Sequence, residues 1–166
     1  MFQVWPVLEL SVSPGSSVRG TELRSIHMKV FQQVVEVSTH GRGFTDLSDR
    51  VEAIVGASGV TTGLCTVFVQ HTSASLVIQE NADPAVRRDL ERWIASIAPE
   101  DAKAYEHDEE GIDDMPSHLR SAITRTSEVI PVTRGRLGLG TWQGIYLWEH
   151  RRSPHTRRLI VHVQGI

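Results

Sequence analysis

Two imidazoles and five carboxylates crowd into twelve consecutive positions of this chain, residues 107–118 (HDEEGIDDMPSH). Imidazole nitrogens suit zinc, whereas carboxylate oxygens suit magnesium or calcium. Five acids this close repel one another unless a positive charge neutralises them. Pro116 can start a short helix that runs to about residue 124 and fixes the side chains near its first turn. We therefore predict a divalent metal ion, zinc or magnesium, bound by His107, Asp114 and His118. A solvated acidic loop is the alternative interpretation.

A second polar group, HTSAS, lies at the end of a strand that we predict over residues 63–71. It begins with His71, and the hydroxyls of Thr72, Ser73 and Ser75 follow. An imidazole beside three hydroxyls can bind an anion or a hydroxyl group of a substrate. The same residues can instead satisfy backbone donors in a turn, so the pattern leaves both interpretations open.

An aromatic strand that carries polar groups follows near the C-terminus, from Gly138 to Arg151 (GLGTWQGIYLWEHR). If the segment is extended, one face carries Gln143, Ile145, Leu147 and Glu149, and the other carries Trp142, Tyr146, Trp148 and His150. A strand that only fills a core does not need polar groups at the ends of one face. The pattern therefore indicates a lined pocket or a subunit interface. Ordinary aromatic packing on an edge strand is the alternative.

Two further polar segments have simpler explanations. In Glu80-Asn81-Ala82-Asp83, the last residue is explained as the N-cap of a helix that starts at Pro84. Asn81 then remains as a possible ligand-binding group. In RGRLGLG, residues 134–140, Arg136 and the neighbouring glycines can hold a phosphate through guanidinium and backbone N–H groups. A flexible turn with solvated charges explains the same residues.

The composition excludes several classes of protein. The 166 residues suit one domain, and 40% hydrophobic with 22% charged residues is typical of a globular protein. The formal charge of −3 does not indicate a basic surface that would bind nucleic acid or an anionic membrane. The single Cys65 excludes an internal disulfide, and its apolar surroundings predict a buried, inert thiol. P-loop, GxGxxG, GxSxG and HExxH motifs are missing, so nucleotide-loop, serine hydrolase and zincin mechanisms lack support.

The first residues need a separate interpretation. The apolar segment MFQVWPVLEL lacks a basic start and a cleavage site, so we predict no signal peptide. No segment approaches the roughly 20 apolar residues that span a bilayer, and we expect a cytoplasmic protein. Because the regular pattern begins at Met28, we predict that residues 1–27 are a poorly ordered extension and that residues 28–166 form the functional domain.

Three helices and about six strands alternate along the predicted domain. We predict helices over residues 45–56, from Pro84 onward and over 116–124, and strands over 30–38, 63–71, 75–79, 127–133, 142–150 and 157–164. Short turns with Gly or Pro join the last strands. This order favours an α+β fold with a largely antiparallel sheet or sandwich.

Three strings in this order closely resemble the YjbQ family: FVQHTSASLVIQENADPAVRRDLERWI, HDEEGIDDMPSHLRSAI and GLGTWQGIYLWEHR. The resemblance covers roughly residues 28–166. It implies a single α+β domain with an antiparallel β-sandwich-like core and two to three helices, assembled as a homotrimer. Members of this family are often described as secondary thiamine-phosphate synthases. That reaction joins an aminopyrimidine methyl diphosphate to a thiazole phosphate and releases pyrophosphate, so the expected partner is a small phosphorylated substrate.

The resemblance also suggests roles for the candidate residues. Diphosphate departure leaves a delocalised cation, which calls for a metal or Arg groups on the departing charge and for aromatic walls. The expected catalytic residues are His71, Ser73 and Glu149, the last of which could hold an amine or a structural Arg. The expected substrate-binding residues are Thr72, Asn81, Arg136, Trp142 and Gln143, in a pocket that can draw on two chains of the trimer. Two alternatives stay open: a non-enzymatic trimer that binds a metal or small anion, and a metal-assisted phosphate hydrolase.

Overall fold

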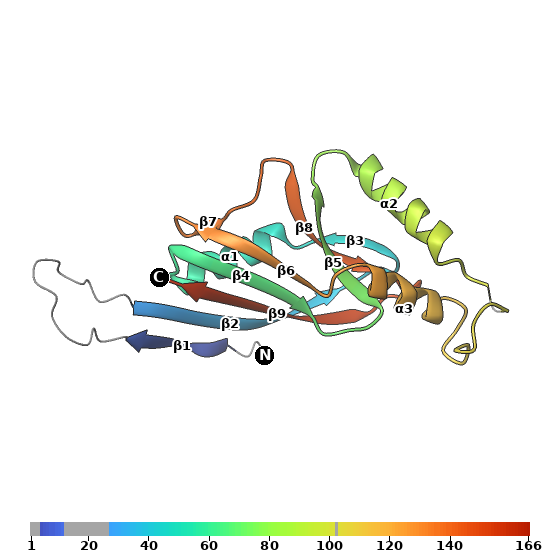
Figure 1. Ribbon diagram of the computed structural model, residues 1–166, viewed down its shortest axis with the longest axis horizontal. Helices are drawn as coiled ribbons and strands as arrows, with labels where there is room; N and C mark the ends of the chain where they lie inside the picture. Colours follow the sequence, from blue (N-terminus) through green and yellow to red (C-terminus); the bar gives the residue numbers. More distant parts are fainter. Residues whose placement is uncertain (1–3, 12–26, 102) are drawn as a thin grey trace, which may run out of the picture.

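The computed structural model describes residues 4–11, 27–101 and 103–166. Two antiparallel sheets and three helices make up this part of the chain (Figure 1). The larger sheet has the order β1 (Val4–Ser11), β2 (His27–Ser38), β9 (Thr156–Gly165), β4 (Thr62–Val69), β6 (Ser127–Thr133) and β7 (Arg136–Leu137). The smaller sheet has the order β3 (Gly43–Asp46), β8 (Gln143–Glu149) and β5 (Ala74–Glu80). The helices are α1 (Ser48–Ser58), α2 (Pro84–Ile97) and α3 (Asp114–Ile123).

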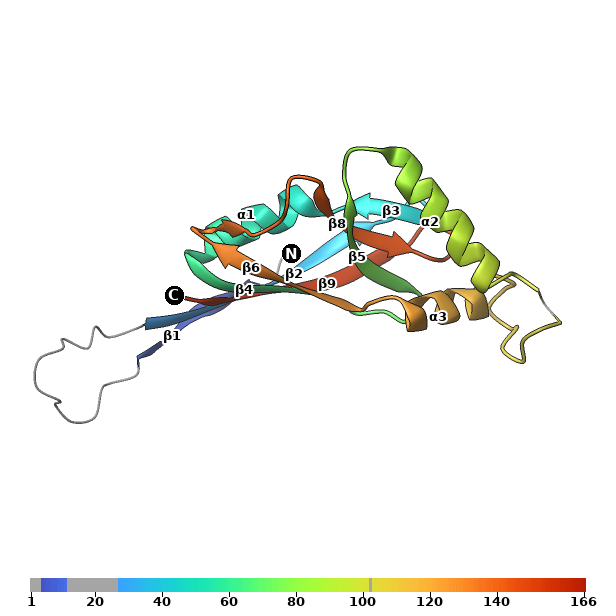
Figure 2. The ribbon, with the colours of Figure 1, turned by 45° about the horizontal axis from the view of Figure 1, so that its top comes forward.

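One hydrophobic core lies between the larger sheet, α1 and the smaller sheet (Figure 2). Alternate residues of β4 and β9 point into it, so Val67 and Val161 are buried while their neighbours Phe68 and Ile160 face outward. The smaller sheet contributes apolar residues such as Ile145 from β8. No helix of the described residues is both long and apolar enough to cross a membrane.

The aromatic strand β8 is the central strand of the smaller sheet and not an edge strand. One of its faces packs on the core through Ile145 and Leu147. The other face meets α2, where Trp148 Nε1 donates to Glu91 and the guanidinium of Arg87 lies over the ring of Tyr146. Both faces are covered from Gly144 to Glu149, so the polar end residue Glu149 is held in a fixed position, whereas Gln143 at the other end is exposed.

The predicted α+β domain with antiparallel strands and three helices is confirmed. The predicted start of α2 is also confirmed, since Asp83 Oδ1 accepts the backbone N–H of Ala85 at 2.7 Å. Two short strands, β3 and β7, were not predicted. The backbone of residues 4–11 pairs with β2 as β1, while residues 1–3 and 12–26 lie outside the described residues. The boundary at residue 27 stays a prediction, as does the homotrimer.

Candidate functional site

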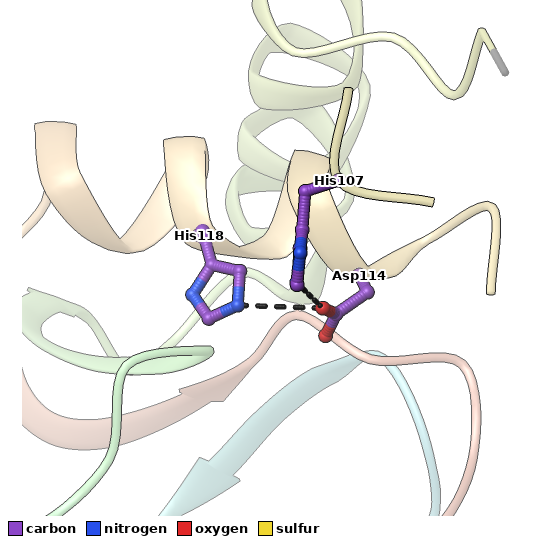
Figure 3. Close-up of side chains that lie close together, drawn as sticks. All are labelled: His107, Asp114 and His118. Carbon is purple, nitrogen blue, oxygen red and sulfur yellow. Dashed lines mark hydrogen bonds and ion pairs between the residues drawn. The ribbon is translucent and has the colours of Figure 1, made fainter. Parts of the chain in front are cut away.

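The three residues expected to bind a metal converge at the start of α3 (Figure 3). His107 Nε2 lies 2.7 Å from Asp114 Oδ2, and His118 Nε2 lies 3.4 Å from the same oxygen. One ligand atom from each residue lies within 4.8 Å of the other two. Asp114 and His118 share one face of the helix because they are four residues apart. The loop after α2 brings His107 to them.

The burial of these residues distinguishes the cluster from the alternative of a solvated acidic loop. The Asp114 side chain is only 2% exposed, whereas those of His107 and His118 are 47% and 33% exposed. The remaining acids of the loop, Asp108, Glu109 and Glu110, are exposed. A buried carboxylate with two half-exposed imidazoles leaves one side of the cluster accessible to solvent.

Neighbouring groups orient the ligands of this cluster. The second oxygen of Asp114 contacts Nη1 of Arg151, whose Nε donates to Asp113 Oδ2 at 3.2 Å. Burial alone would raise the pKa of Asp113, but the backbone N–H of Arg152 and the charge of Arg151 outweigh it and hold that pKa below its usual value.

The orientation of His118 fits a cation. Its Nδ1 lies 3.1 Å from the carbonyl oxygen of Thr72, and a carbonyl can only accept, so Nδ1 carries a proton. In a neutral ring the Nε2 lone pair then faces the carboxylate of Asp114, which is favourable only with a positive charge between them. Two nitrogens, one oxygen and an open side are the donor set of a metal site with room for a substrate. The residues therefore fit zinc or another divalent ion.

A buried ion pair lies beside this cluster. Arg157 donates from Nε to Glu149 Oε2 at 2.7 Å and from Nη2 to Oε1 at 2.6 Å. Thr39 Oγ1 donates to Oε2 at 3.1 Å, and the backbone N–H of Arg151 donates to Oε1 at 3.0 Å. Burial would raise the pKa of Glu149, but these bonds, chiefly those from Arg157, lower it below its ordinary value. Glu149 is fully buried, and the structural arginine that it was expected to hold is Arg157; its catalytic role stays a prediction.

The loop between β4 and β5 joins the ion pair to the metal cluster. Arg157 Nη2 donates to Ser73 Oγ at 3.2 Å, and both the Oγ and the backbone N of Ser73 lie 3.1 Å from His71 Nδ1. Burial and the charge of Arg157 lower the pKa of His71. Thr72 lies between His71 and Ser73 in the chain, and its carbonyl oxygen accepts a hydrogen bond from His118 Nδ1. His71, Thr72 and Ser73 therefore lie next to the metal cluster, as does Glu149.

Comparison with known proteins places the chain in a family. The family described as "UPF0047 protein YjbQ-like" matches residues 33–166. The UPF0047 protein sll1880 of Synechocystis is 58% identical over 134 residues, which cover 81% of this chain and 91% of that protein. The chain belongs to the YjbQ-like UPF0047 family. The YjbQ protein of Salmonella typhimurium is 46% identical to the present chain, over 81% of this chain and 98% of that protein.

Solved structures agree with this assignment. A crystal structure of a YbjQ-like protein of unknown function from Sulfolobus solfataricus superposes on this YjbQ-like chain with a TM-score of 0.78. The two chains are 30% identical, and the match covers 84% of this chain and all of the other. A YjbQ/UPF0047 protein from Clostridium acetobutylicum gives a TM-score of 0.70 at 34% identity, over 78% and 98% of the two chains.

Three expected substrate-binding residues of the YjbQ-like chain lie together, but away from the histidines. Asn81 Nδ2 donates to the carbonyl oxygen of Thr141 at 3.2 Å, beside Trp142 and Gln143. Trp142 and Gln143 line a groove of about 520 Å³ next to β5. Gln143 pairs with Glu80 at one end of the β5–β8 ladder, whereas Glu149 pairs with Ala74 at the other. Six residues of extended chain separate these ends by about 20 Å.

Arg136 lies elsewhere again. It is in β7, and its Nε donates to Glu52 Oε1 of α1 at 2.8 Å. Figure 1 shows β7 on the left and α3 on the right of the molecule. Within one chain, Arg136 therefore does not reach the metal cluster.

Sequence reasoning missed Arg151 and Arg157. The sequence does carry a signal for Arg157. It shares the inward face of β9 with Leu159 and Val161, so the alternation predicts a charged side chain in the core. A charge at such a position needs a partner. Arg151 follows the end of β8 and carries no comparable pattern.

Proposed function

We propose that this YjbQ-like protein binds a divalent metal ion, zinc or magnesium, and uses it to act on a small phosphorylated substrate. The observation that carries the proposal is the convergence of His107, Asp114 and His118, with their ligand atoms within 4.8 Å of one another. Three protein ligands are typical of a metal site that keeps a position open for chemistry.

Each group of residues would have a separate role in this function. His107, Asp114 and His118 would hold the ion, and Arg151 would keep the Asp114 carboxylate in place through its second oxygen. A bound divalent ion would supply Lewis acidity and neutralise negative charge on a phosphate group. His71, in the adjoining loop, would contact the substrate, and the Glu149–Arg157 pair supports that loop from inside through Ser73.

Thiamine phosphate formation is the reaction that the family resemblance implies. Release of pyrophosphate needs charge stabilisation on the departing group, which the metal cluster would provide. It also needs a surface for two heteroaromatic rings, for which Trp142 and Gln143 are the candidates. These two residues lie at the end of β8 opposite Glu149, about 20 Å along the strand from the end that adjoins the metal cluster. A second copy of the chain would have to bring them to the site, as a homotrimer allows.

Hydrolysis of a single phosphate ester or anhydride is the second candidate. The separation of Trp142 from the metal cluster favours it, because hydrolysis does not require a second ring to stack beside the phosphate. A trimer that only binds a metal or small anion is the non-enzymatic outcome.

Metal content and product release test these candidates together. We expect elemental analysis to find about one metal ion per chain in the wild type and a near-complete loss in His118→Ala. The matched control is His162→Ala, because His162 lies on the outer face of the larger sheet, away from α3. No bound metal after supplementation with zinc and magnesium would contradict the proposal.

The reaction is read in the same preparations. Pyrophosphate released only with both the pyrimidine diphosphate and the thiazole phosphate identifies the synthase. Phosphate released from one substrate alone identifies the hydrolase. Thermal stabilisation by ligand without turnover identifies the binding trimer and contradicts the enzymatic proposal.

A further inference from the structure

Hydrogen bonds around His71 determine which of its ring nitrogens carries the proton. The backbone N–H of Ser73 donates to His71 Nδ1 at 3.1 Å. A backbone N–H can only donate, so Nδ1 accepts through its lone pair and has no proton. A neutral imidazole carries one proton, which is therefore on Nε2.

A buried arginine orients the Ser73 hydroxyl. Arg157 Nη2 donates to Ser73 Oγ at 3.2 Å, and a guanidinium has no acceptor. The Ser73 oxygen therefore accepts from Arg157, and its own hydrogen is available to His71 Nδ1 at 3.1 Å. Ser73 is only 1% exposed, so bulk water does not compete for this hydroxyl.

Arg157 is fixed in turn by Glu149. The pair is bidentate and the two residues are 2% and 0% exposed, so the plane of the guanidinium is set by the carboxylate. Donation then runs in one direction, from Arg157 through Ser73 to His71. The positive charge of Arg157 adds to burial in lowering the pKa of His71, which favours the neutral ring.

His71 is the chain neighbour of the residue that contacts the metal cluster. The residue as a whole is open to solvent, although its ring is partly covered. The next residue, Thr72, accepts a hydrogen bond from His118 Nδ1 at 3.1 Å.

We propose that Arg157 is a positioning residue: through Ser73 it holds His71 as the Nε2–H tautomer, and this N–H donates a hydrogen bond to a phosphate oxygen of the substrate. The inference rests on the proposed function only for the nature of that oxygen. His71 keeps its proton, because giving it up would leave an imidazolate anion. It therefore stabilises negative charge and does not act as a general acid or base.

The tautomer is measured directly, without turnover. A long-range ¹H–¹⁵N NMR spectrum of the metal-free protein, with His71 assigned by comparison with His71→Gln, distinguishes protonated from unprotonated ring nitrogens. We expect Nδ1 without a proton and Nε2 with one. A protonated Nδ1 in the wild type would overturn the inference, even if the protein turns over substrate.

Two variants test the relay. Ser73→Ala removes the hydroxyl but leaves the Arg157–Glu149 pair intact, so folding is retained; Arg157→Lys keeps a positive charge but loses the bidentate geometry. Both variants keep the backbone N–H of residue 73 as a donor to Nδ1 but lose the hydroxyl donor or its orientation. We therefore expect Nε2–H to remain the main form and a minor Nδ1–H form of His71 to become detectable. Arg158→Lys is the matched control, because Arg158 is the exposed neighbour on the other face of β9. A Ser73→Ala spectrum identical to that of the wild type would remove Arg157 from this role.

The donor role has its own readout. Inorganic phosphate added with zinc should shift the His71 Nε2 resonance in the wild type, and no shift would overturn donation to phosphate. With an active substrate, His71→Gln should lower kcat about a hundredfold with KM nearly unchanged, as for other donors to a developing oxyanion. A protein with the expected tautomer and phosphate response but no turnover would contradict the proposed function and leave the positioning role standing.

Discussion

Glu149 ends β8 with both carboxylate oxygens occupied by donors of the chain itself. We expect Glu149→Gln to lower the free energy of unfolding by about 3–5 kcal/mol, because it leaves the buried charge of Arg157 without a counter-ion. Urea unfolding measures the change. The double variant Glu149→Gln/Arg157→Gln should recover part of the loss, since it leaves no unpaired charge.

Glu128 provides the comparison for this prediction. It is also buried, but its partner Arg125 has a side chain that is 75% exposed. Water therefore solvates the partner when Glu128→Gln breaks the pair, and we expect a cost below about 1 kcal/mol. Equal costs for Glu149→Gln and Glu128→Gln would contradict the structural role that we assign to Glu149.

His150 makes stability depend on pH. It is fully buried and Ser75 Oγ lies 2.9 Å from its Nε2. Burial first, and then the charges of Arg120, Arg42 and Arg157, lower its pKa from 6.5 to about 3. Between these two values the unfolded chain binds a proton that the folded chain does not. Stability from this residue is therefore complete above about pH 6.5 and falls by about 1.4 kcal/mol for each pH unit below it.

A variant isolates this contribution. His150→Gln keeps a side-chain amide for Ser75 but cannot titrate, so the loss of unfolding free energy between pH 6.5 and 4.5 should be smaller than in the wild type by about 2–3 kcal/mol. His162→Gln should retain the slope of the wild type. Parallel slopes in the wild type and His150→Gln would show that His150 is not buried as a neutral ring.

At the scale of elements, α2 begins with a defined cap. Asp83 Oδ1 accepts from Ala85 N at 2.7 Å, and Pro84 occupies the first turn. We expect Asp83→Ala to lower the free energy of unfolding by about 1 kcal/mol, while Asp83→Asn keeps most of the stability. Asp89→Ala is the control, because Asp89 pairs with Arg92 on the exposed face and should cost less than about 0.5 kcal/mol. Similar losses at both sites would argue against the cap.

The same helix shows what a sequence can predict and where it stops. Its cap follows from local rules that need no tertiary structure, as do the alternating strands β2, β4 and β9. The strands β3 and β7 have only four and two residues, too few to display a period, and they form because β8 and β6 offer them a free edge. Leu90, Trp93, Ile94 and Ile97 recur at helical spacing, which predicts one buried face of α2. Ile94 is buried, yet Trp93 and Ile97 are 53% and 50% exposed.

The candidate site also has a part that the sequence predicts and a part that only the tertiary structure shows. His107, Asp114 and His118 could be predicted because they lie within one short segment. The link from Glu149 through Arg157 to Ser73 joins three segments, and only the pairing of β5 with β8 and the return of β9 bring them together. The distance of Trp142 and Gln143 from the histidines has the same origin, since it depends on the register of the β5–β8 ladder.

At the scale of the whole molecule, the outer face of the larger sheet carries an apolar patch. Phe68, Ile160 and Val34 lie side by side across β4, β9 and β2, and Leu64 lies opposite Pro131 of β6. Phe68 and Leu64 are each 41% exposed. None of the described helices covers this face (Figure 2). An uncovered apolar patch on a sheet is typical of an interface.

The patch leads to a prediction about assembly. We expect a homotrimer in solution and expect Phe68→Glu to convert it into monomers, because the new charge would be desolvated in the interface. Light scattering coupled to size-exclusion chromatography measures the mass. Trp93→Glu, on the solvent side of α2, is the control for an exposed aromatic residue and should leave the trimer intact. If Trp93→Glu gives monomers and Phe68→Glu does not, the copies meet through α2, and the outer face of the larger sheet is free for another partner.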